Sequence, residues 1–251
     1  MRIISICNQK GGCAKTTTAI NIAAELALEG HKVLMIDNDY QANLTAAFGI
    51  TDAEFSLYDV FTEEVKLKDI IVKTTVLDTL DLVPSNINFS GFELAFADDD
   101  NNKTLLKDIL KKSKLKYDYI IIDCPPSLNL AVVNAMTVSN DIIIPLEASL
   151  FNYQGLSNLL KIISMIKQGL NKKLNVAGIV LTRVDSRTKL GTEFVEPINK
   201  IAPGKLFNTK IHQSTAVVRS QLCGLPVSLY DSRSRASKEY KELVKEIVNN
   251  A

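Results

Sequence analysis

Short runs of β-branched and other apolar residues alternate along this chain with longer segments of helical periodicity, and this alternation limits the possible folds more than any other feature. Several of the short runs are apolar on both faces, as expected of strands in the middle of a sheet that is covered on both sides. The pattern therefore predicts an α/β fold with a doubly wound, mostly parallel sheet and helices on both faces. Strands are predicted at residues 2–7, 33–37, 80–84, 117–123, 141–146, 176–182 and 206–211, and helices at residues 16–29, 104–114, 154–168, 192–201 and 237–248.

The chain is long enough for such a sheet and gives no sign of a second domain. Its 251 residues are 46% hydrophobic, which is too apolar for a disordered protein. No internal repeat and no linker rich in Pro, Gly or Ser divides it, so we expect a single domain over residues 1–251. The polar segment 97–103 is predicted to be an exposed loop or the entry to a helix.

Composition excludes several classes of protein. The four cysteines have no paired spacing and the chain has two histidines, so we expect reduced thiols and no Cys/His zinc site. The longest apolar stretches, such as residues 119–122 and 142–146, are far shorter than the ~20 residues of a membrane-spanning helix. The first strand follows Met1 directly, without the pattern of a signal peptide. These features predict a cytoplasmic protein.

The segment between the first strand and the first helix carries the most chemical information. Gly11 and Gly12 let the backbone bend close to a ligand, and the N–H groups that open the helix point at the same place, which suits a chain of phosphates. Lys15 then supplies a cation for the phosphates, and Thr16 supplies a hydroxyl for Mg²⁺. The residues predicted to bind this ligand are Lys10, Gly11, Gly12, Cys13, Ala14, Lys15, Thr16 and Thr17.

An ordinary Gly-Gly turn before a helix is the alternative interpretation of this segment. The strict phosphate-loop pattern G-x-x-x-x-G-K-[ST] is not met, because Gln9 and Ala14 stand where its outer glycines belong. The position of the segment, between a strand and a helix, favours the phosphate loop. Because Cys13 lies beside a helix N-terminus, we also expect its thiol to have a lowered pKa.

Residues 10–16, Lys-Gly-Gly-Cys-Ala-Lys-Thr, resemble the deviant Walker A box of the ParA/MinD family of ATPases, K-G-G-x-G-K-[ST], in which a signature lysine precedes the glycines. Ala14 replaces a glycine of that box, which predicts a stiffer loop. Residues 37–43 are similar to the family's D-x-D-x-Q-x-N segment, and residues 119–127 resemble its Walker B and switch II segments. The likeness extends to residues 181–191 and 231–240. It implies a P-loop ATPase that binds ATP and Mg²⁺, closest to the ParA/Soj-type partition ATPases.

Three aspartates follow predicted strands. Asp123 ends a very apolar strand, where a carboxylate is costly unless it meets a cation, and Mg²⁺ is the expected partner. By resemblance, Asp39 positions the attacking water and Asp37 supports the outer shell of the metal. The predicted metal set is therefore Thr16, Asp37 and Asp123. The alternative is that Asp37 and Asp39 only cap turns.

Lys10 matches the signature lysine of the family. Phosphoryl transfer needs positive charge where negative charge develops, and an ammonium group supplies it. The resemblance implies that Lys10 crosses a two-fold axis to the nucleotide of a second copy, so that ATP makes a homodimer and hydrolysis releases it. The predicted catalytic residues are Lys10, Lys15 and Asp39; the alternative for Lys10 is a solvated loop lysine. Adenine is expected near Arg183 and His212.

The charge distribution favours DNA as a partner. Residues 1–100 hold 7 basic and 16 acidic side chains, whereas residues 101–251 hold 22 and 12. A basic surface binds DNA phosphates without sequence preference. Arg187 matches a DNA-contacting arginine of the resembled family, but Ala216 occupies the place of the second, with Arg219 three residues on. The predicted DNA-binding residues are Arg187, Lys189 and Arg219; simple solubility is the alternative role for each.

Other functions fit the sequence less well. A MinD-like, membrane-cycling regulator of division needs a cationic amphipathic helix, but the polar face of residues 237–248 has three lysines and three glutamates. We expect this helix to pack on the sheet and no membrane partner. An electron-transfer protein like the nitrogenase iron protein needs a second cysteine in a loop comparable to that of Cys124, and the sequence shows none. A metabolic kinase needs a pocket for an acceptor substrate, which no segment indicates. Operator binding needs a helix-turn-helix, and because the sequence shows none, binding to a specific operator is not expected.

The sequence thus predicts a nucleoid-associated, ParA-type positioning ATPase. ATP closes a homodimer, the dimer binds non-specific DNA, and a ParB-like or cargo-adaptor protein stimulates slow ATP hydrolysis. The cargo is a plasmid, a chromosome or a protein organelle such as a carboxysome.

Overall fold

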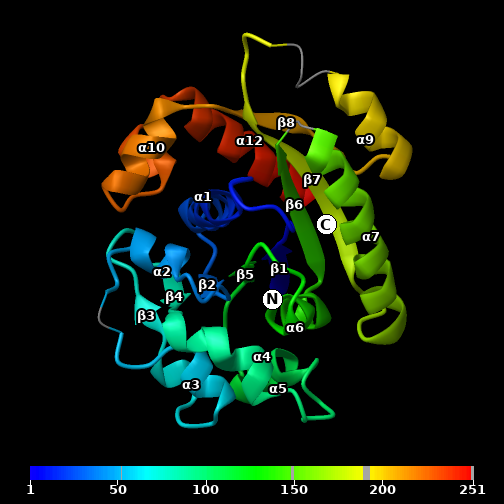
Figure 1. Ribbon diagram of the computed structural model, residues 1–251. Helices are drawn as coiled ribbons and strands as arrows, with labels where there is room; N and C mark the ends of the chain where they lie inside the picture. The colour runs from blue at the N-terminus through cyan, green and yellow to red at the C-terminus, as the bar shows by residue number, and fades with distance from the viewer. Residues whose placement is uncertain (52, 148–149, 189–192, 250–251) are drawn as a thin grey trace.

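All seven predicted strands lie in one eight-stranded sheet with the order β3-β4-β2-β5-β1-β6-β7-β8 (Figure 1). The computed structural model describes residues 1–51, 53–147, 150–188 and 193–249. Every pair of neighbouring strands is parallel except β3 and β4, which confirms the predicted fold class. The strands are β1 Arg2–Ile6, β2 Val33–Asp37, β3 Val72–Lys73, β4 Leu80–Val83, β5 Tyr119–Asp123, β6 Asp141–Glu147, β7 Asn175–Val184 and β8 Leu206–His212.

The central strands are buried on both faces because they carry apolar residues at most positions. In β5, Ile120 and Ile122 belong to the hydrophobic core on one face of the sheet, and Ile121 belongs to the core on the other. Ile121 lies opposite Ile4 of β1, which packs on the same face. The two faces therefore bury separate cores, as expected of a doubly wound sheet.

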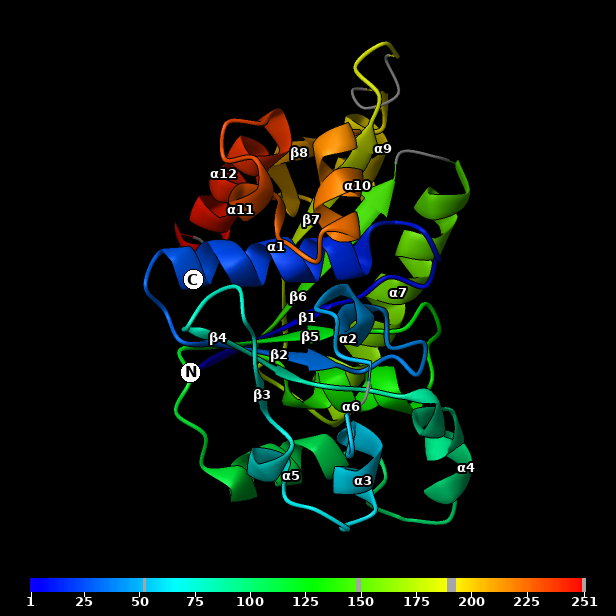
Figure 2. The ribbon, with the colours of Figure 1, turned by 90° about the vertical axis from the view of Figure 1, so that its left-hand side faces the viewer.

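Helices cover both faces, and Figure 2 shows them above and below the sheet. One face carries α1 Lys15–Leu28, α2 Asn43–Ala47, α10 Thr215–Leu222, α11 Val227–Tyr230 and α12 Arg235–Asn249. The other carries α3 Leu57–Phe61, α4 Phe92–Ala95, α5 Leu105–Ser113, α6 Leu130–Val138, α7 Leu150–Gly169 and α9 Val195–Ile201, with the short 3₁₀ helices η1 Leu67–Asp69 and η2 Ile87–Gly91. The five predicted helices correspond to α1, α5, α7, α9 and α12.

The last helix confirms the packing expected from its apolar face. Tyr240, Leu243, Val244 and Ile247 of α12 are at most 1% exposed and belong to the core shared with α1 and β8. The apolar face of this helix is thus already covered within one chain. Among the described residues, no helix is long and apolar enough to cross a membrane.

Several elements were not predicted, each for a physical reason. β3 is a two-residue edge strand, too short to show a period. α6 is apolar on nearly all sides because it is buried between the sheet and α5 and α7, so it has no amphipathic pattern. In α10, Val218 and Leu222 are 58% and 84% exposed, so apolar residues also occupy its exposed side and the sequence does not show which side is buried. Residues 97–103 form exposed and half-buried turns, as expected.

The parallel arrangement determines where chemistry is possible. The carboxyl ends of parallel strands lie at the same edge of the sheet. The segments that follow β1, β2, β5, β7 and β8 therefore meet there, and they contain nearly all the predicted site residues.

Candidate functional site

The loop that follows β1 is fixed at its start by buried polar contacts. Asn8 is 6% exposed, and its Nδ2 donates to the Pro145 carbonyl at the end of β6 at 2.6 Å. The Lys10 amide donates to Asn8 Oδ1 at 3.1 Å. The loop then turns through Gly12, with φ 75°, and Ala14, with φ 65°. The left-handed conformation costs a non-glycine residue about 1–2 kcal/mol, so Ala14 holds the loop in a strained but well-defined shape.

The first helix opens with amide groups directed at the loop. Helix α1 begins at Lys15, and no side chain among the described residues caps it. Uncapped amide groups and the helix dipole favour an anion here. The Lys15 side chain is 7% exposed, and its Nζ donates to the Lys10 carbonyl at 3.1 Å. An ammonium group held over an uncapped helix start is suited to bind phosphate.

The carboxylate at the end of β5 is short of a partner. Asp123 is 1% exposed, and its Oδ2 accepts a hydrogen bond from Thr16 Oγ1 at 2.6 Å. Among the described residues, none forms a hydrogen bond with its buried Oδ1. Burial, with the nearby charge of Asp37 second, raises the pKa of Asp123 to about 8. A buried oxygen with no donor beside a threonine hydroxyl fits Mg²⁺, which prefers oxygen ligands.

Asp37 has a different environment from Asp123. Its Oδ2 accepts hydrogen bonds from the amide and the hydroxyl of Thr45, at 2.8 and 2.7 Å, and its Oδ1 accepts one from the Asp39 amide at 3.3 Å. Burial raises its pKa to about 6. Asp37 therefore holds the start of α2 and the residue Asp39 in place. Its role beside the metal stays a prediction.

A cavity of about 1270 Å³ lies at this edge of the sheet and is large enough for a nucleotide. Asp39, which is 7% exposed, also lines it, and its Oδ1 accepts from the Gln41 amide at 3.0 Å. The predicted site residues that line the cavity are Gly11, Gly12, Ala14, Lys15, Thr16, Thr17, Asp39, Arg183, Arg187 and His212. Those outside its lining are Lys10, Cys13, Asp37, Asp123 and Arg219; Lys189 lies outside the described residues.

The side chain of Lys10 is exposed at the outside of the loop. Its backbone accepts the Lys15 ammonium group and the Cys13 thiol, but within the described parts of the chain nothing pairs with its Nζ. A single copy of the protein thus leaves this cation available to another molecule.

The expected low pKa of Cys13 is wrong. The thiol is 1% exposed and donates to the Lys10 carbonyl at 3.2 Å. Burial raises its pKa, and this effect outweighs the opposite influence of the Lys15 charge. Cys13 instead packs inside the loop, and its carbonyl accepts the Thr182 hydroxyl at 3.1 Å.

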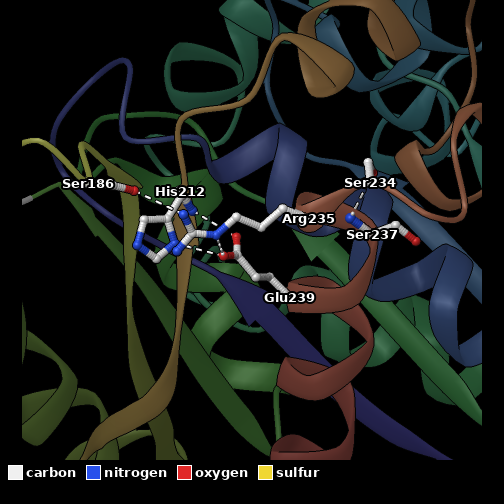
Figure 3. Close-up of polar contacts among 6 residues, drawn as sticks. All are labelled: Ser186, His212, Ser234, Arg235, Ser237 and Glu239. Atoms are coloured by element: carbon white, nitrogen blue, oxygen red, sulfur yellow. Dashed lines mark hydrogen bonds and ion pairs between the residues drawn. The ribbon is translucent and has the colours of Figure 1, made fainter.

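Two strand ends form the far wall of the cavity. At the end of β7, Arg183 donates from Nη1 to the Gly12 carbonyl at 3.0 Å. At the end of β8, His212 contacts Glu239 of α12 with its Nδ1 at 2.7 Å (Figure 3). Arg235 donates to the same Glu239 oxygen at 2.7 Å and to Ser186 Oγ at 2.9 Å. Sequence reasoning missed Glu239 and Arg235, since both lie on the polar face of an amphipathic helix.

Of the predicted DNA-binding residues, Arg187 lines the cavity and Arg219 lies on α10 between the lining residues Val218 and Gln221. Arg187 is 85% exposed at its side chain and pairs with Asp185 at 2.7 Å, and this pairing lowers the pKa of Asp185 to about 2. Arg219 is exposed on α10 and has no ion pair among the described residues. The next turn of α10 contacts the loop, because Gln221 Nε2 donates to Thr17 Oγ1 at 2.9 Å.

Comparisons with known proteins agree with this geometry. Residues 1–176 match a family described as an AAA domain. The chain is 39% identical over 251 residues to the sporulation initiation inhibitor protein Soj of Bacillus subtilis, covering 99% of each. It is 36% identical over 241 residues to the chromosome-partitioning ATPase Soj of Treponema pallidum, covering 96% of this chain and 94% of that protein.

A solved structure extends the likeness to the fold. Cobyrinic acid a,c-diamide synthase from Mycobacterium smegmatis, with a bound ATP analogue and magnesium, has a TM-score of 0.88 and 28% identity. The match covers 99% of this chain and 94% of that one. The similarity therefore includes the phosphate loop, the aspartates and the later strands together.

Proposed function

The chain belongs to the ParA/Soj family of partition ATPases, and from this premise we propose that it is an ATP-driven switch that positions a cargo on DNA. Its activity is the hydrolysis of ATP, with Mg²⁺ as the metal ion. The observation that carries the proposal is the buried Asp123 oxygen to which no described residue donates, beside Thr16 and a start of α1 that no described side chain caps.

The residues at the loop have separate tasks in hydrolysis. Thr16 and Asp123 are suited to hold Mg²⁺, which supplies positive charge against the triphosphate when bound. Lys15 exchanges the Lys10 carbonyl for a phosphate oxygen, since an anion is the better acceptor for an ammonium group. Asp39, which is nearly buried and lines the cavity, orients the attacking water.

The proposed homodimer uses the Lys10 ammonium group, which pairs with none of the residues that the structure describes in its own chain. Lys10 reaches the triphosphate of the second copy and stabilises the charge that develops there. ATP then joins two chains, and its hydrolysis removes the group that Lys10 binds. A ParB-like or cargo-adaptor protein accelerates this step and so releases the dimer.

Contacts between the cavity and the basic residues support control of DNA binding by the nucleotide. Thr17 of the phosphate loop accepts a hydrogen bond from Gln221 of α10, the helix that carries Arg219. On the far wall, Arg235 donates a hydrogen bond to Ser186, which directly precedes Arg187 in the sequence. A change of nucleotide state can thus move both arginines, which bind phosphates of the nucleoid without reading sequence.

A DNA gel shift with ATP, ADP and no nucleotide, repeated over a salt series, tests the proposal. We expect retardation with ATP alone and a steep loss of affinity as salt rises. Arg219→Ala should reduce the slope against salt by about one unit, whereas Lys111→Ala, an exposed lysine of α5 on the other face, should leave it unchanged. Equal retardation in all three nucleotide states would contradict the switch, and ATP-dependent pelleting with anionic liposomes instead of DNA would favour the MinD-like alternative.

A further inference from the structure

Glu239 holds the end of β8 at two points. Its Oε2 accepts a hydrogen bond from the His212 backbone amide at 2.9 Å, and its Oε1 lies 2.7 Å from His212 Nδ1. The side chains of His212 and Glu239 are 17% and 14% exposed, respectively. Helix α12 presents Glu239 firmly, because its first turn is capped by Ser234 Oγ, which accepts from the Ser237 amide at 3.2 Å (Figure 3).

This contact determines which nitrogen of His212 carries hydrogen. An ionised carboxylate only accepts hydrogen bonds, so Nδ1 must be the donor to Glu239. In a neutral imidazole, Nε2 is then an acceptor with a free lone pair. Arg235 Nε also donates to Glu239 Oε1, at 2.7 Å, and its charge balances that of the carboxylate. Within the described residues, His212 Nε2 has no hydrogen-bond partner, and Figure 3 shows that ring nitrogen turned away from Glu239.

His212 lines the far wall of the cavity, beyond Arg183, while the phosphate loop forms the near wall. A nucleotide with its phosphates on the loop directs its base toward the far wall. Adenine carries a 6-amino group, which donates hydrogen bonds, whereas guanine carries an oxygen at position 6, which only accepts them. An acceptor nitrogen on this wall forms a hydrogen bond with the 6-amino group of adenine, whereas the oxygen at position 6 of guanine leaves that nitrogen without a donor.

We propose that His212 Nε2 accepts a hydrogen bond from the 6-amino group of adenine, and that Glu239, balanced by Arg235, is the positioning residue that fixes the required tautomer. The inference rests on the proposed position of the triphosphate at the phosphate loop. It makes this histidine a determinant of the preference for adenine over guanine nucleotides.

Binding of diphosphates by the full-length chain at pH 8, measured by calorimetry, tests the proposal. ADP is compared with purine riboside diphosphate, which lacks the 6-amino group, with GDP and with 2′-deoxy-ADP. The parent should bind ADP about tenfold more tightly than purine riboside diphosphate. His212→Ala should reduce this ratio to near one and leave the affinity for purine riboside diphosphate unchanged, which also shows that the variant is folded. An unchanged ratio, or a variant that loses only its discrimination against 2′-deoxy-ADP, would overturn the assignment.

The positioning role of Glu239 needs its own variant and control. Glu246 is a second carboxylate of α12 that holds β8, through the amides of Asn208 and Thr209 at 2.9 and 2.8 Å, but among the described residues none of its hydrogen bonds reaches His212. Glu239→Gln should lower the ADP to purine riboside diphosphate ratio at least about threefold, and Glu246→Gln should not change it. Equal effects of the two substitutions would contradict a special role of Glu239.

The tautomer can be read in the parent protein without any variant. The ¹⁵N chemical shifts of the His212 ring should show hydrogen on Nδ1, and a ring with hydrogen on Nε2 would overturn the proposal. Diphosphates do not depend on ATP-driven dimerisation, so failure of the DNA switch leaves these results interpretable. If the phosphates did not lie at the loop, Lys15→Ala would leave the affinity for all four diphosphates unchanged, whereas equal weakening of all four would support their position there.

Discussion

The two walls of the cavity are built in different ways. The near wall consists of the segments after β1, β2 and β5 in the middle of the sheet, where strand register places Ile6 beside Asp123 and Asp123 beside Asp37. The far wall consists of the segments after β7 and β8 with α12, where side chains distant in sequence meet. The near wall owes its geometry to buried strands, and the far wall owes it to polar contacts between helix and strand.

This difference suggests that the near wall is rigid and common to many chains, while the far wall is adjustable. A parallel strand buried on both faces tolerates little change in position. Partly exposed hydrogen bonds, such as that between Arg235 and Ser186, are individually weak and depend on side chains that are free to vary. We therefore expect general phosphate chemistry on the near wall and specificity on the far wall.

The largest expected effect concerns Lys10. Lys10→Ala should abolish ATP-dependent dimerisation, because the cation that no described residue of its own chain binds is removed, while binding of ATP to the monomer persists. Light scattering with ATP, and calorimetry of nucleotide binding, measure the two properties. Lys32→Ala, an exposed lysine after α1, is the control. Dimerisation of the variant to the same extent as the parent would refute the role of Lys10 and leave the near wall complete within one chain.

The second prediction concerns the pH dependence of the near wall. Because the pKa of Asp123 is raised to about 8 in the folded protein, from about 4 in the unfolded chain, the folded state binds this proton more tightly. The contribution of Asp123 to the free energy of unfolding of the nucleotide-free protein should therefore be greatest near pH 4 and fall until pH passes 8. The contribution of Asp37, with a pKa of about 6, falls over the lower part of the same range.

The Asp123→Asn variant tests whether the Asp123 carboxylate causes this pH dependence of stability. The variant should melt at a higher temperature than the parent at pH 8, with a difference that shrinks toward pH 5, and it should lose stabilisation by Mg²⁺ with ADP. Asp78→Asn, at an exposed carboxylate, should show no pH-dependent difference. A parent whose melting temperature rises from pH 5 to pH 8 would contradict the buried-carboxylate explanation.

The near wall could be predicted from the sequence better than the far wall, because strand ends form the first and contacts between distant side chains form the second. Lys15, Thr16 and Asp123 stand directly after or before apolar runs, so strand ends bring them to one edge without further information. Glu239 and His212 are 27 positions apart, and no periodicity relates them. The pKa of Cys13 was misjudged because the direction of its side chain, into the loop, is a matter of packing and not of spacing. β2, β5 and β6 were predictable because their apolar runs are continuous; α6 was not, because burial on all sides removes its period.

The third prediction tests the packing behind the far wall. Gly178 lies in β7 beside an irregular pairing with β6, and a Cβ there would come within 2.4 Å of the Phe207 ring of β8. Gly178→Ala should therefore lower the free energy of unfolding by about 1–3 kcal/mol. Gly155→Ala, at a helical position with nothing within 4 Å, should instead raise it by about 0.5–1 kcal/mol. Denaturant titration measures both. If Gly178→Ala were neutral, β7 and β8 would be movable relative to each other.

The smallest effect belongs to the strained loop of the near wall. Ala14 and Ala42 both adopt left-handed conformations, with φ 65° and 52°, directly before α1 and α2. Glycine removes a cost of about 1–2 kcal/mol at such a position but loses about 0.5–1 kcal/mol through the greater freedom of the unfolded chain. Ala14→Gly and Ala42→Gly should each stabilise the nucleotide-free protein by up to about 1 kcal/mol in denaturant titration.

Their effects on ADP should differ. Ala14 forms part of the phosphate loop, and a more mobile loop must be ordered on binding, so Ala14→Gly should weaken ADP about two- to threefold. Ala42 does not line the cavity, and its substitution should leave the affinity unchanged. If both variants bound ADP like the parent, the strain at Ala14 would serve the entry into α1 alone. A loss specific to Ala14→Gly would instead mean that the rigidity of the near wall includes its loop, because one methyl group fixes in advance the shape that the phosphates require.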